Sequence, residues 1–257
     1  MNILVIGGSA AGCFAALLLA RGGHEVVVLD KDQLELAPDV ESAAAAAFRT
    51  TAPQIVQPHI ILARCRLLLA EHLPDVYEQL LAAGVVEAPL VTQMSPTLAD
   101  RAPRPGDEQL TMLMTRRSTL DWVLLRAVVG QPGITLRRGV SVAGLLAVPG
   151  TPPHVTGVHT SDGDLSADLV IDAAGRLSPI DRWLKEIGAR VSGTWWAECG
   201  VAYFSRHYKL RQGVTPPAPM TTRIVEALDE FMGFTHRRDA TDHTDNTERE
   251  DRRGFRG

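Results

Sequence analysis

The sequence predicts an α/β fold in which a parallel sheet is covered on both faces. Residues 2–6 (NILVI) and 25–29 (EVVVL) are continuous apolar runs, as in strands that are buried on both faces. Residues 10–21 between them are mostly small or leucine, and Gly22-Gly23 follows, which predicts a helix and its end. A strand, a helix and a second strand of these lengths form the crossover that joins parallel strands.

The loop after the first strand carries a modified nucleotide-binding fingerprint. Gly7-Gly8-Ser9-Ala10-Ala11-Gly12 matches G-x-G-x-x-G except that Ser9 replaces the middle glycine. The outer glycines allow a tight turn and close helix packing, and the N–H groups at the helix start suit a pyrophosphate. We expect Ser9 to weaken phosphate binding without abolishing it, its hydroxyl donating to a phosphate oxygen. A structural βαβ unit without ligand is the alternative.

Two charged residues end the second strand. Asp30 stands where dinucleotide-binding folds carry an acidic residue that accepts hydrogen bonds from a ribose. Lys31 is either a partner for a phosphate or a solvated lysine. With the preceding loop, these residues predict a Rossmann-like FAD/NAD(P)-binding domain with a parallel sheet.

The middle of the chain is predicted to be largely helical. Residues 33–58 are alanine-rich and irregular, whereas residues 60–83 have helical spacing that is interrupted at Pro74 and ends at Gly84. The proline-rich residues 94–109 predict a loop. Thr115 is expected to cap the helix that begins in TRRSTLDWVLLRAVV.

Short strands are expected in the following segment. They cover residues 134–137, 140–148 and 155–160, with a hairpin turn at 161–164. A buried strand is expected in ADLVIDAAGRLSP and a short helix over 183–187.

Composition limits the function classes. The hydrophobic content of 45% is that of a globular protein, and the net charge of −4 gives no electrostatic case for a nucleic-acid partner. Cys13, Cys65 and Cys199 predict neither a disulfide framework nor a zinc site, and we expect no metal and a cytoplasmic location. No apolar run reaches the roughly 20 residues of a membrane span.

Three segments, in order, resemble the flavoprotein monooxygenase family built like para-hydroxybenzoate hydroxylase, with its halogenase and geranylgeranyl reductase relatives. The first is VIGGSAAG…VVVLD, and the second is the helix starting at Arg117 (RSTLDWVL), similar to the family's R-x-x-L-x-x-x-L. The third is ADLVIDAAGRLSP, which lies where the family has the strand that leads to its Asp-Gly motif. The resemblance covers roughly residues 1–210.

The resemblance implies FAD as cofactor and indicates further residues that would bind it. In the family, the arginine matching Arg117 helps to hold the flavin dinucleotide. Ala174 replaces the aspartate of the Asp-Gly motif, so Asp172 is expected to substitute for it beside Gly175. Simpler explanations stand beside these roles: a surface arginine, a turn-capping aspartate and a glycine needed for positive φ. Use of NAD(P)H, or of a flavin reductase as partner, is left open.

The resemblance also implies that the family's second half is missing. Its returning Gly-Asp-Ala segment is not found, because neither Gly106-Asp107 nor Gly163-Asp164 follows a buried strand. We therefore expect a chain truncated at its C-terminus, and a partner chain that completes the fold is one explanation. The expected domains are an FAD-binding domain (1–190), the start of an antiparallel substrate domain (191–234) with a strand over 197–208, and a polar, disordered tail (235–257).

Two functions are carried forward. The first is an FAD-dependent oxidoreductase, of the monooxygenase type, acting on a small hydrophobic or aromatic substrate. The second is a truncated, non-catalytic dinucleotide-binding module. An NAD-dependent dehydrogenase shares the fingerprint but leaves the Arg117 helix unexplained. No catalytic residue can be named: His59 in QPHIILARC is more readily a packed or surface histidine.

Overall fold

The computed structural model describes residues 1–33, 35–94, 98–193, 195, 197–198, 200 and 211, together with the backbone of 225–228 and 231–234. The strand expected over 197–208 lies almost wholly outside these residues, and the tail of 235–257 lies wholly outside them. Val225–Leu228 (β11) and Phe231–Phe234 (β12) pair as an antiparallel hairpin. The expected domain boundaries stay a prediction.

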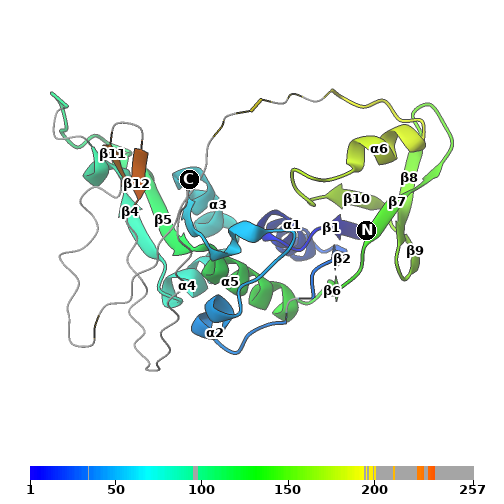
Figure 1. The fold of residues 1–257 in the computed structure, drawn as a ribbon, viewed down its shortest axis with the longest axis horizontal. Coiled ribbons are helices and arrows are strands. Elements are labelled where there is room, and N and C mark those ends of the chain that lie inside the picture. Colours follow the sequence, from blue (N-terminus) through cyan, green and yellow to red (C-terminus); the bar gives the residue numbers. More distant parts are fainter. Residues whose placement is uncertain are drawn as a thin grey trace, which may run out of the picture.

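A four-stranded parallel sheet lies near the middle of the molecule (Figure 1). Its order is β10-β1-β2-β6, and all neighbours are parallel. α1 connects β1 to β2, as the sequence predicts, and the α/β class is confirmed. The bounds are β1 Asn2–Ile6, α1 Ala10–Arg21, β2 Glu25–Asp30, β6 Ile134–Arg138 and β10 Leu169–Asp172.

Both faces of this sheet are covered. Ile3 and Val5 of β1 pack in the core beneath α1, whereas Leu4 and Ile6 pack on the opposite face. That second face meets Trp183 and an antiparallel sheet, β7-β8-β9. Because alternate side chains of β1 enter two different cores, the strand is apolar at nearly every position. The covering elements are β7 Val142–Val148, β8 His154–Thr160, β9 Gly163–Ser166 and α6 Ile180–Glu186.

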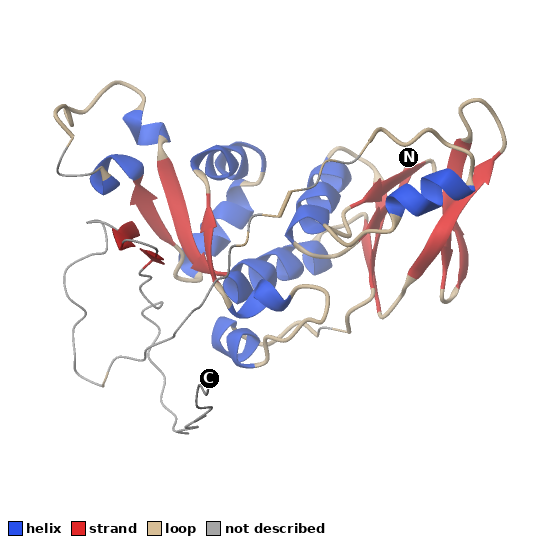
Figure 2. Ribbon diagram, turned by 45° about the horizontal axis from the view of Figure 1, so that its top comes forward, coloured by secondary structure: helices blue, strands red, loops and turns tan. Residues whose placement is uncertain are grey.

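The long connection from β2 to β6 adds a helical layer and a third sheet. The antiparallel sheet β3-β5-β4 lies beyond the helices, at the opposite end of the molecule from the β7-β8-β9 sheet (Figure 2). Helices α1, α3, α4 and α5 share one core that includes Leu17, Val76 and Leu124. The elements are α2 Val40–Ala45, η1 Pro53–Val56, β3 Pro58–Ile61, α3 Ala63–His72, α4 Pro74–Ala82, β4 Val86–Pro89, η2 Leu90–Gln93, η3 Asp107–Gln109, β5 Thr111–Arg116 and α5 Arg117–Gly130.

The helix predicted over 60–83 begins later than expected. The extended residues Ile60 and Ile61 belong to β3, where they pair with Met114 and Leu113 of β5, so the helical spacing starts only at Ala63. The interruption at Pro74 is confirmed, because α4 begins there. Gly84 follows α4 with φ of 87°.

Three further local predictions were wrong. Thr115 does not cap α5, because β5 runs through Arg116 and Arg116 itself is the N-cap. The irregular segment 33–58 contains α2, whose N-cap Asp39 accepts a hydrogen bond from the Ser42 N–H. α6 starts at Ile180 rather than at Trp183. None of the helices in the described part of the chain is long and apolar enough to cross a membrane.

Candidate functional site

The carboxyl edge of the parallel sheet gathers most of the predicted residues. β1 ends at Ile6, which lies in register with Leu29 of β2 and with Asp172 of β10. Residues 7–12, here the glycine loop, therefore emerge between Asp30 and the Asp172 turn. Open α/β sheets bind ligands outside the carboxyl ends of their strands, where the connections leave in opposite directions. β1 is flanked by β2 and β10 and occupies that position.

The outer glycines of the loop are required by packing. Gly7 has φ of 100°, and a Cβ there would lie 2.6 Å from the carbonyl oxygen of Ala173. A Cβ on Gly12 would lie 1.8 Å from the carbonyl oxygen of Gly7. The backbone of the fold thus demands both glycines whether or not a ligand binds.

Ser9 is the N-cap of α1, yet its side chain does not cap the helix. Its backbone is extended (φ −89°, ψ −172°), a conformation open to any residue, so the fold does not need glycine here. Its hydroxyl accepts a 2.7 Å hydrogen bond from Nη2 of Arg117. Helix geometry leaves the first N–H groups of α1 without partners inside the helix, which is the arrangement that binds phosphate.

Arg117 reaches the loop from the first position of α5. Its backbone N–H donates to the Gln57 carbonyl at 3.0 Å, which ties the start of the helix to the residue before β3. Its Nε donates to Oδ1 of Asp121 at 2.7 Å while Nη2 holds Ser9. Only 9% of the residue is exposed. The structure therefore places the Arg117 guanidinium, which the family resemblance predicts to hold the cofactor, against the glycine loop.

The carboxylate of Asp30 binds protein groups at both oxygens. Oδ1 accepts the N–H of Asp32 at 2.8 Å. Oδ2 accepts the N–H of Gly8 at 3.1 Å and Nη2 of Arg49 at 2.5 Å. Asp30 thereby links the end of β2 to the glycine loop.

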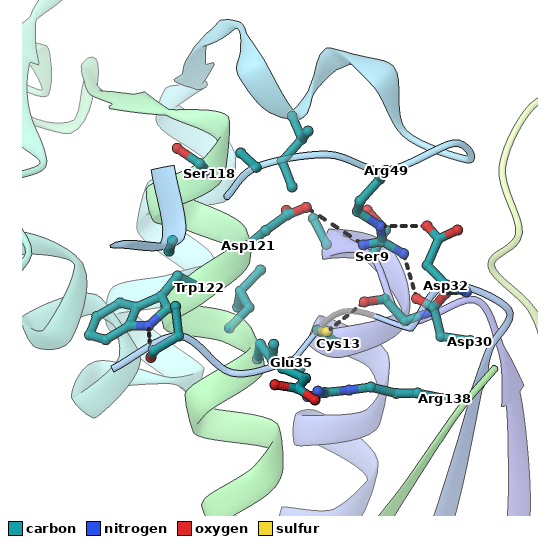
Figure 3. Close-up of a pocket in the computed structure, with 18 of the residues that line it drawn as sticks. Ser9, Cys13, Asp30, Asp32, Glu35, Arg49, Ser118, Asp121, Trp122 and Arg138 are labelled. Carbon is teal, nitrogen blue, oxygen red and sulfur yellow. Dashed lines mark hydrogen bonds and ion pairs between the residues drawn. The ribbon is translucent and has the colours of Figure 1, made fainter. Parts of the chain in front are cut away.

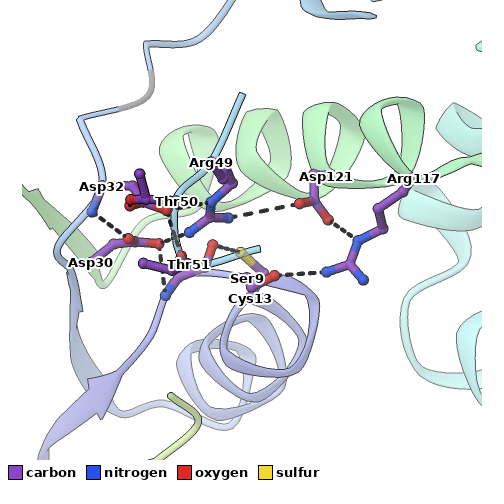
Figure 4. A network of polar contacts seen from close by, with 10 residues as sticks. Ser9, Cys13, Asp30, Asp32, Arg49, Thr50, Thr51, Arg117 and Asp121 are labelled. Atoms are coloured by element: carbon purple, nitrogen blue, oxygen red, sulfur yellow. Dashed lines mark hydrogen bonds and ion pairs between the residues drawn. The ribbon is translucent and has the colours of Figure 1, made fainter. Parts of the chain in front are cut away.

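Arg49 is the centre of a charged network that sequence reasoning missed (Figure 4). Besides Asp30, its guanidinium contacts Asp32 at 2.8 Å and lies 3.7 Å from Asp121. The residue is 6% exposed; burial opposes its charge, but the surrounding carboxylates outweigh burial and raise its pKa. Burial would raise the pKa of Asp32, but hydrogen bonds from Thr51 and Arg49 lower it.

The sequence contains weak indications of the roles of Arg49 and Asp121. Arg49 is the one charged residue within the segment 42–53 (SAAAAAFRTTAP), so its charge stands in an apolar context. Asp121 follows Arg117 by four residues, the spacing at which oppositely charged side chains meet on a helix.

A cavity of about 70 Å³ lies between α1, α5 and the segment 35–55 (Figure 3). Its polar end is formed by the glycine loop and the Arg49 network, and its apolar wall is rich in alanine. Trp122 fixes that wall by donating from Nε1 to the Ala37 carbonyl at 2.8 Å. The lining is Gly8, Ser9, Ala10, Cys13, Asp30, Asp32, Glu35, Ala37, Ala43, Ala46, Ala47, Arg49, Ile55, Ser118, Asp121, Trp122, Leu124, Leu125, Leu136 and Arg138.

Cys13 in this lining is a structural thiol. Burial above all, with a contribution from Asp121, raises its pKa to about 12. Its Sγ donates to the Gly8 carbonyl at 3.3 Å. The thiol thus stays protonated and supports the loop from within α1.

Other predicted site residues lie outside the cavity. Lys31 and Ala11 are exposed. Asp172 accepts hydrogen bonds from the Ala174 N–H at 3.0 Å and the Ser178 hydroxyl at 2.5 Å, and Gly175 has φ of 84°. The turn-forming explanations of Asp172 and Gly175 are thus both visible, and their turn touches the glycine loop through Gly7.

His59 and the possible metal ligands were the remaining candidates near the site. His59 on β3 is half-buried, and burial, followed by the charge of Arg117, lowers its pKa. Across the described part of the chain, no group of three His, Cys, Asp or Glu side chains is arranged to hold a metal ion.

Comparison with known proteins identifies relatives of similar fold. No family model matches the chain. Protein Rv3254 of Mycobacterium tuberculosis is 27% identical over 83% of this chain and 46% of that protein. A mutant of Pseudomonas aeruginosa PqsL superposes with a TM-score of 0.53 and 14% identity, covering 76% of this chain and 48% of PqsL. PqsL is described as a probable FAD-dependent monooxygenase.

A second fold relative has a different described reaction. PyrE3, described as a Diels-Alderase of pyrroindomycin biosynthesis, gives a TM-score of 0.50 at 16% identity over 72% of this chain and 34% of PyrE3. The chain spans about half the length, or less, of these proteins. The chain is thus similar in fold to the FAD-binding part of flavin-dependent monooxygenases.

Proposed function

We propose that the chain is the FAD-binding part of a flavin-dependent oxidoreductase of the monooxygenase type. The observation that carries the proposal is the guanidinium of Arg117 held 2.7 Å from Ser9 in the glycine loop. A helix N-terminus, a buried arginine and a strand-end carboxylate at one sheet edge supply what a dinucleotide needs: phosphate donors and a ribose acceptor.

The polar groups at the carboxyl edge fit the adenosine and pyrophosphate of FAD, but the cavity beside them is small. The free N–H groups of α1 and the Arg117 guanidinium suit the pyrophosphate, and Asp30 suits ribose hydroxyls. Pockets that enclose small molecules measure roughly 300–1,000 Å³, whereas the cavity measures about 70 Å³. Enclosing any part of FAD in this cavity would therefore require the Arg49 side chain and the alanine wall to shift.

FAD, when bound, supplies the electron transfer and oxygen activation, and the protein supplies binding, orientation and exclusion of water. The proposed substrate is a small hydrophobic or aromatic molecule, and the proposed reductant is NAD(P)H or a flavin reductase. The PqsL structure in complex with 2-aminobenzoylacetate (TM-score 0.52, 14% identity) supports an aromatic substrate class. A partner chain that completes the fold belongs to the same proposal.

A dinucleotide-binding module without turnover is the second candidate. It is supported by groups at the carboxyl edge: Arg117 and the first N–H groups of α1 suit a phosphate, and Asp30 suits a ribose. Oxidation of NAD(P)H in air by the FAD-loaded protein, measured with and without an added flavin reductase and in excess of the reductase alone, separates the two candidates, because only an oxidoreductase sustains it.

A titration followed by flavin fluorescence tests the shared claim. We expect FAD to bind, ADP to compete with it, and riboflavin, which lacks the pyrophosphate and adenosine, to bind far more weakly. Arg117→Ala should weaken FAD binding about tenfold or more, the size of a lost hydrogen bond to a charged group. The matched control is Arg182→Ala, because that side chain is 66% exposed on α6. Equal affinities of both variants would contradict the proposal.

A further inference from the structure

We propose that Asp121 is a positioning residue that holds Arg117 against the glycine loop. The inference rests on the proposed dinucleotide function, for which it names a residue that acts through another and need not touch the cofactor. Oδ1 of Asp121 accepts Nε of Arg117 at 2.7 Å, and the same guanidinium donates from Nη2 to Ser9. The two side chains of the pair are each 11% exposed.

Helix stability does not explain this pair. Arg117 is the first residue of α5, and a cation at a helix N-terminus opposes the helix dipole. The first turn of α5 has no acidic residue to compensate. The neutralising carboxylate stands one turn later, at Asp121, where it fixes the direction of the guanidinium. An ion pair at this spacing stabilises a helix only slightly, so we assign the arrangement to the contact with the loop.

Asp121 also faces the second buried arginine. Its Oδ2 lies 3.7 Å from Nη1 of Arg49 and has no hydrogen-bond partner among the described residues. The Asp121 carboxylate thus lies between Arg117, which contacts the glycine loop, and Arg49 of the Asp30 network, as Figure 4 shows. An incompletely satisfied buried carboxylate costs stability. It also adds negative charge beside the proposed phosphate position, so its benefit must be geometric.

Charge and geometry are separated by two substitutions. Asp121→Asn and Asp121→Ala remove the same charge, but only asparagine keeps an oxygen that can accept from Arg117. Positioning predicts that Asp121→Asn binds FAD as tightly as the wild type or more tightly. It predicts that Asp121→Ala binds about tenfold more weakly, as expected when a charged group loses a hydrogen bond. A charge effect alone predicts that both variants bind more tightly by the same factor, and this result would overturn the inference.

A double substitution locates the effect on Arg117. In the Arg117→Ala background, Asp121→Ala should cause no further loss of FAD affinity, because the group that it positions is gone. Arg117→Lys gives the same information without touching Asp121: a lysine keeps the charge but lacks the planar fork that reaches both partners. Its affinity should fall as in Asp121→Ala. An additive double variant, or an unaffected Arg117→Lys, would count against positioning.

A measurement without cofactor makes the inference independent of FAD binding. The rate of phenylglyoxal modification is measured at Arg117 by peptide mass spectrometry, relative to Arg104 and Arg182, whose side chains are 72% and 66% exposed. Arg117 should be protected in the wild type and Asp121→Asn, and modified several-fold faster in Asp121→Ala, because a released guanidinium is more accessible. Thermal unfolding identifies any variant that has simply lost its fold.

The two readouts distinguish the possible failures. If the wild type binds no FAD but the modification rates follow the prediction, the proposed function fails and Asp121 still positions Arg117. If FAD binds and the three modification rates are equal, the positioning role is wrong. If Asp121→Ala does not fold, Asp121→Leu, which also lacks an acceptor for Arg117 but fills the space of the side chain, decides the question by the same two measurements.

Discussion

The guanidinium of Arg117 donates a 2.7 Å hydrogen bond to the hydroxyl of Ser9, a residue 108 positions earlier in the chain. This contact answers why serine stands in place of the middle glycine of the fingerprint. The serine neither caps α1 nor clashes with its surroundings; it joins the glycine loop to α5. The hydroxyl thus acts first toward an arginine of the protein, and its predicted contact with a phosphate stays a prediction.

Removing the Ser9 hydroxyl should loosen Arg117. Ser9→Ala is expected to weaken FAD binding about three- to tenfold, since a hydrogen bond between a neutral and a charged group is lost at a partly exposed position. Ser9→Thr is the matched control, because it keeps the hydroxyl and suits the extended backbone. Fluorescence titration with FAD measures the affinity of both variants. Equal affinities for Ser9→Ala and the wild type would show that the contact is irrelevant to binding.

Replacing Gly12 by alanine should lower the free energy of unfolding. A Cβ at Gly12 would lie 1.8 Å from the Gly7 carbonyl oxygen, so Gly12→Ala must displace the loop from the helix. We expect a loss of several kcal/mol, about 3 or more, as for other backbone clashes in a core. Gly130→Ala at the end of α5 is the control, because a Cβ there meets nothing within 4 Å. Urea unfolding of both variants gives the comparison, and equal midpoints would contradict the described packing.

Arg49 should contribute strongly to stability. Arg49→Met keeps much of the length but leaves Asp30 and Asp32 as buried charges without their cation. Breaking a buried ion pair in this way costs about 3–5 kcal/mol. The control Arg21→Met breaks the Arg21–Asp75 pair, whose side chains are 29% and 52% exposed, and should cost about 1 kcal/mol or less. Unfolding free energies at neutral pH test the difference, and similar values would refute the network's importance.

His59 should make stability fall in mild acid. The folded pKa of His59 lies below its ordinary value of 6.5, so the unfolded chain takes up the proton first. The contribution is fully present above pH 6.5 and is lost as the pH falls through the lower folded pKa. His59→Gln should flatten the unfolding free energy in this window. An unchanged slope between wild type and variant would place the pH dependence elsewhere.

The sequence predicts the first strand–helix–strand unit and its glycine loop well, because their signals are local. Continuous apolar strands, the glycine loop and the strand-end Asp30 each follow from short-range sterics and burial, and the structure confirms the α/β class. β3, β4 and β5 were missed because they form a separate antiparallel sheet whose pairing partners lie far apart in the chain, and β5 runs directly into α5. Thr115 has the chemistry of a helix cap, but the pairing of β5 extends one residue beyond it.

Only part of the candidate site could be predicted from the sequence, because only part of it lies in local motifs. Gly7, Gly12 and Arg117 occur in recognisable spacing, whereas Arg49 lies in an alanine-rich segment without any motif. Its role depends on three carboxylates from β2, the following turn and α5, which only the tertiary fold brings together. Lys31 illustrates the converse: a residue adjacent to Asp30 in sequence is exposed, away from the cavity.

The visible absorption spectrum of the purified protein, recorded after incubation with excess FAD and desalting, tests the central claim most directly. We predict a retained flavin spectrum with the bands shifted from those of free FAD, and loss of that spectrum in Arg117→Ala but not in Arg182→Ala. A colourless wild-type protein after desalting, with no FAD binding by fluorescence titration, would contradict the account.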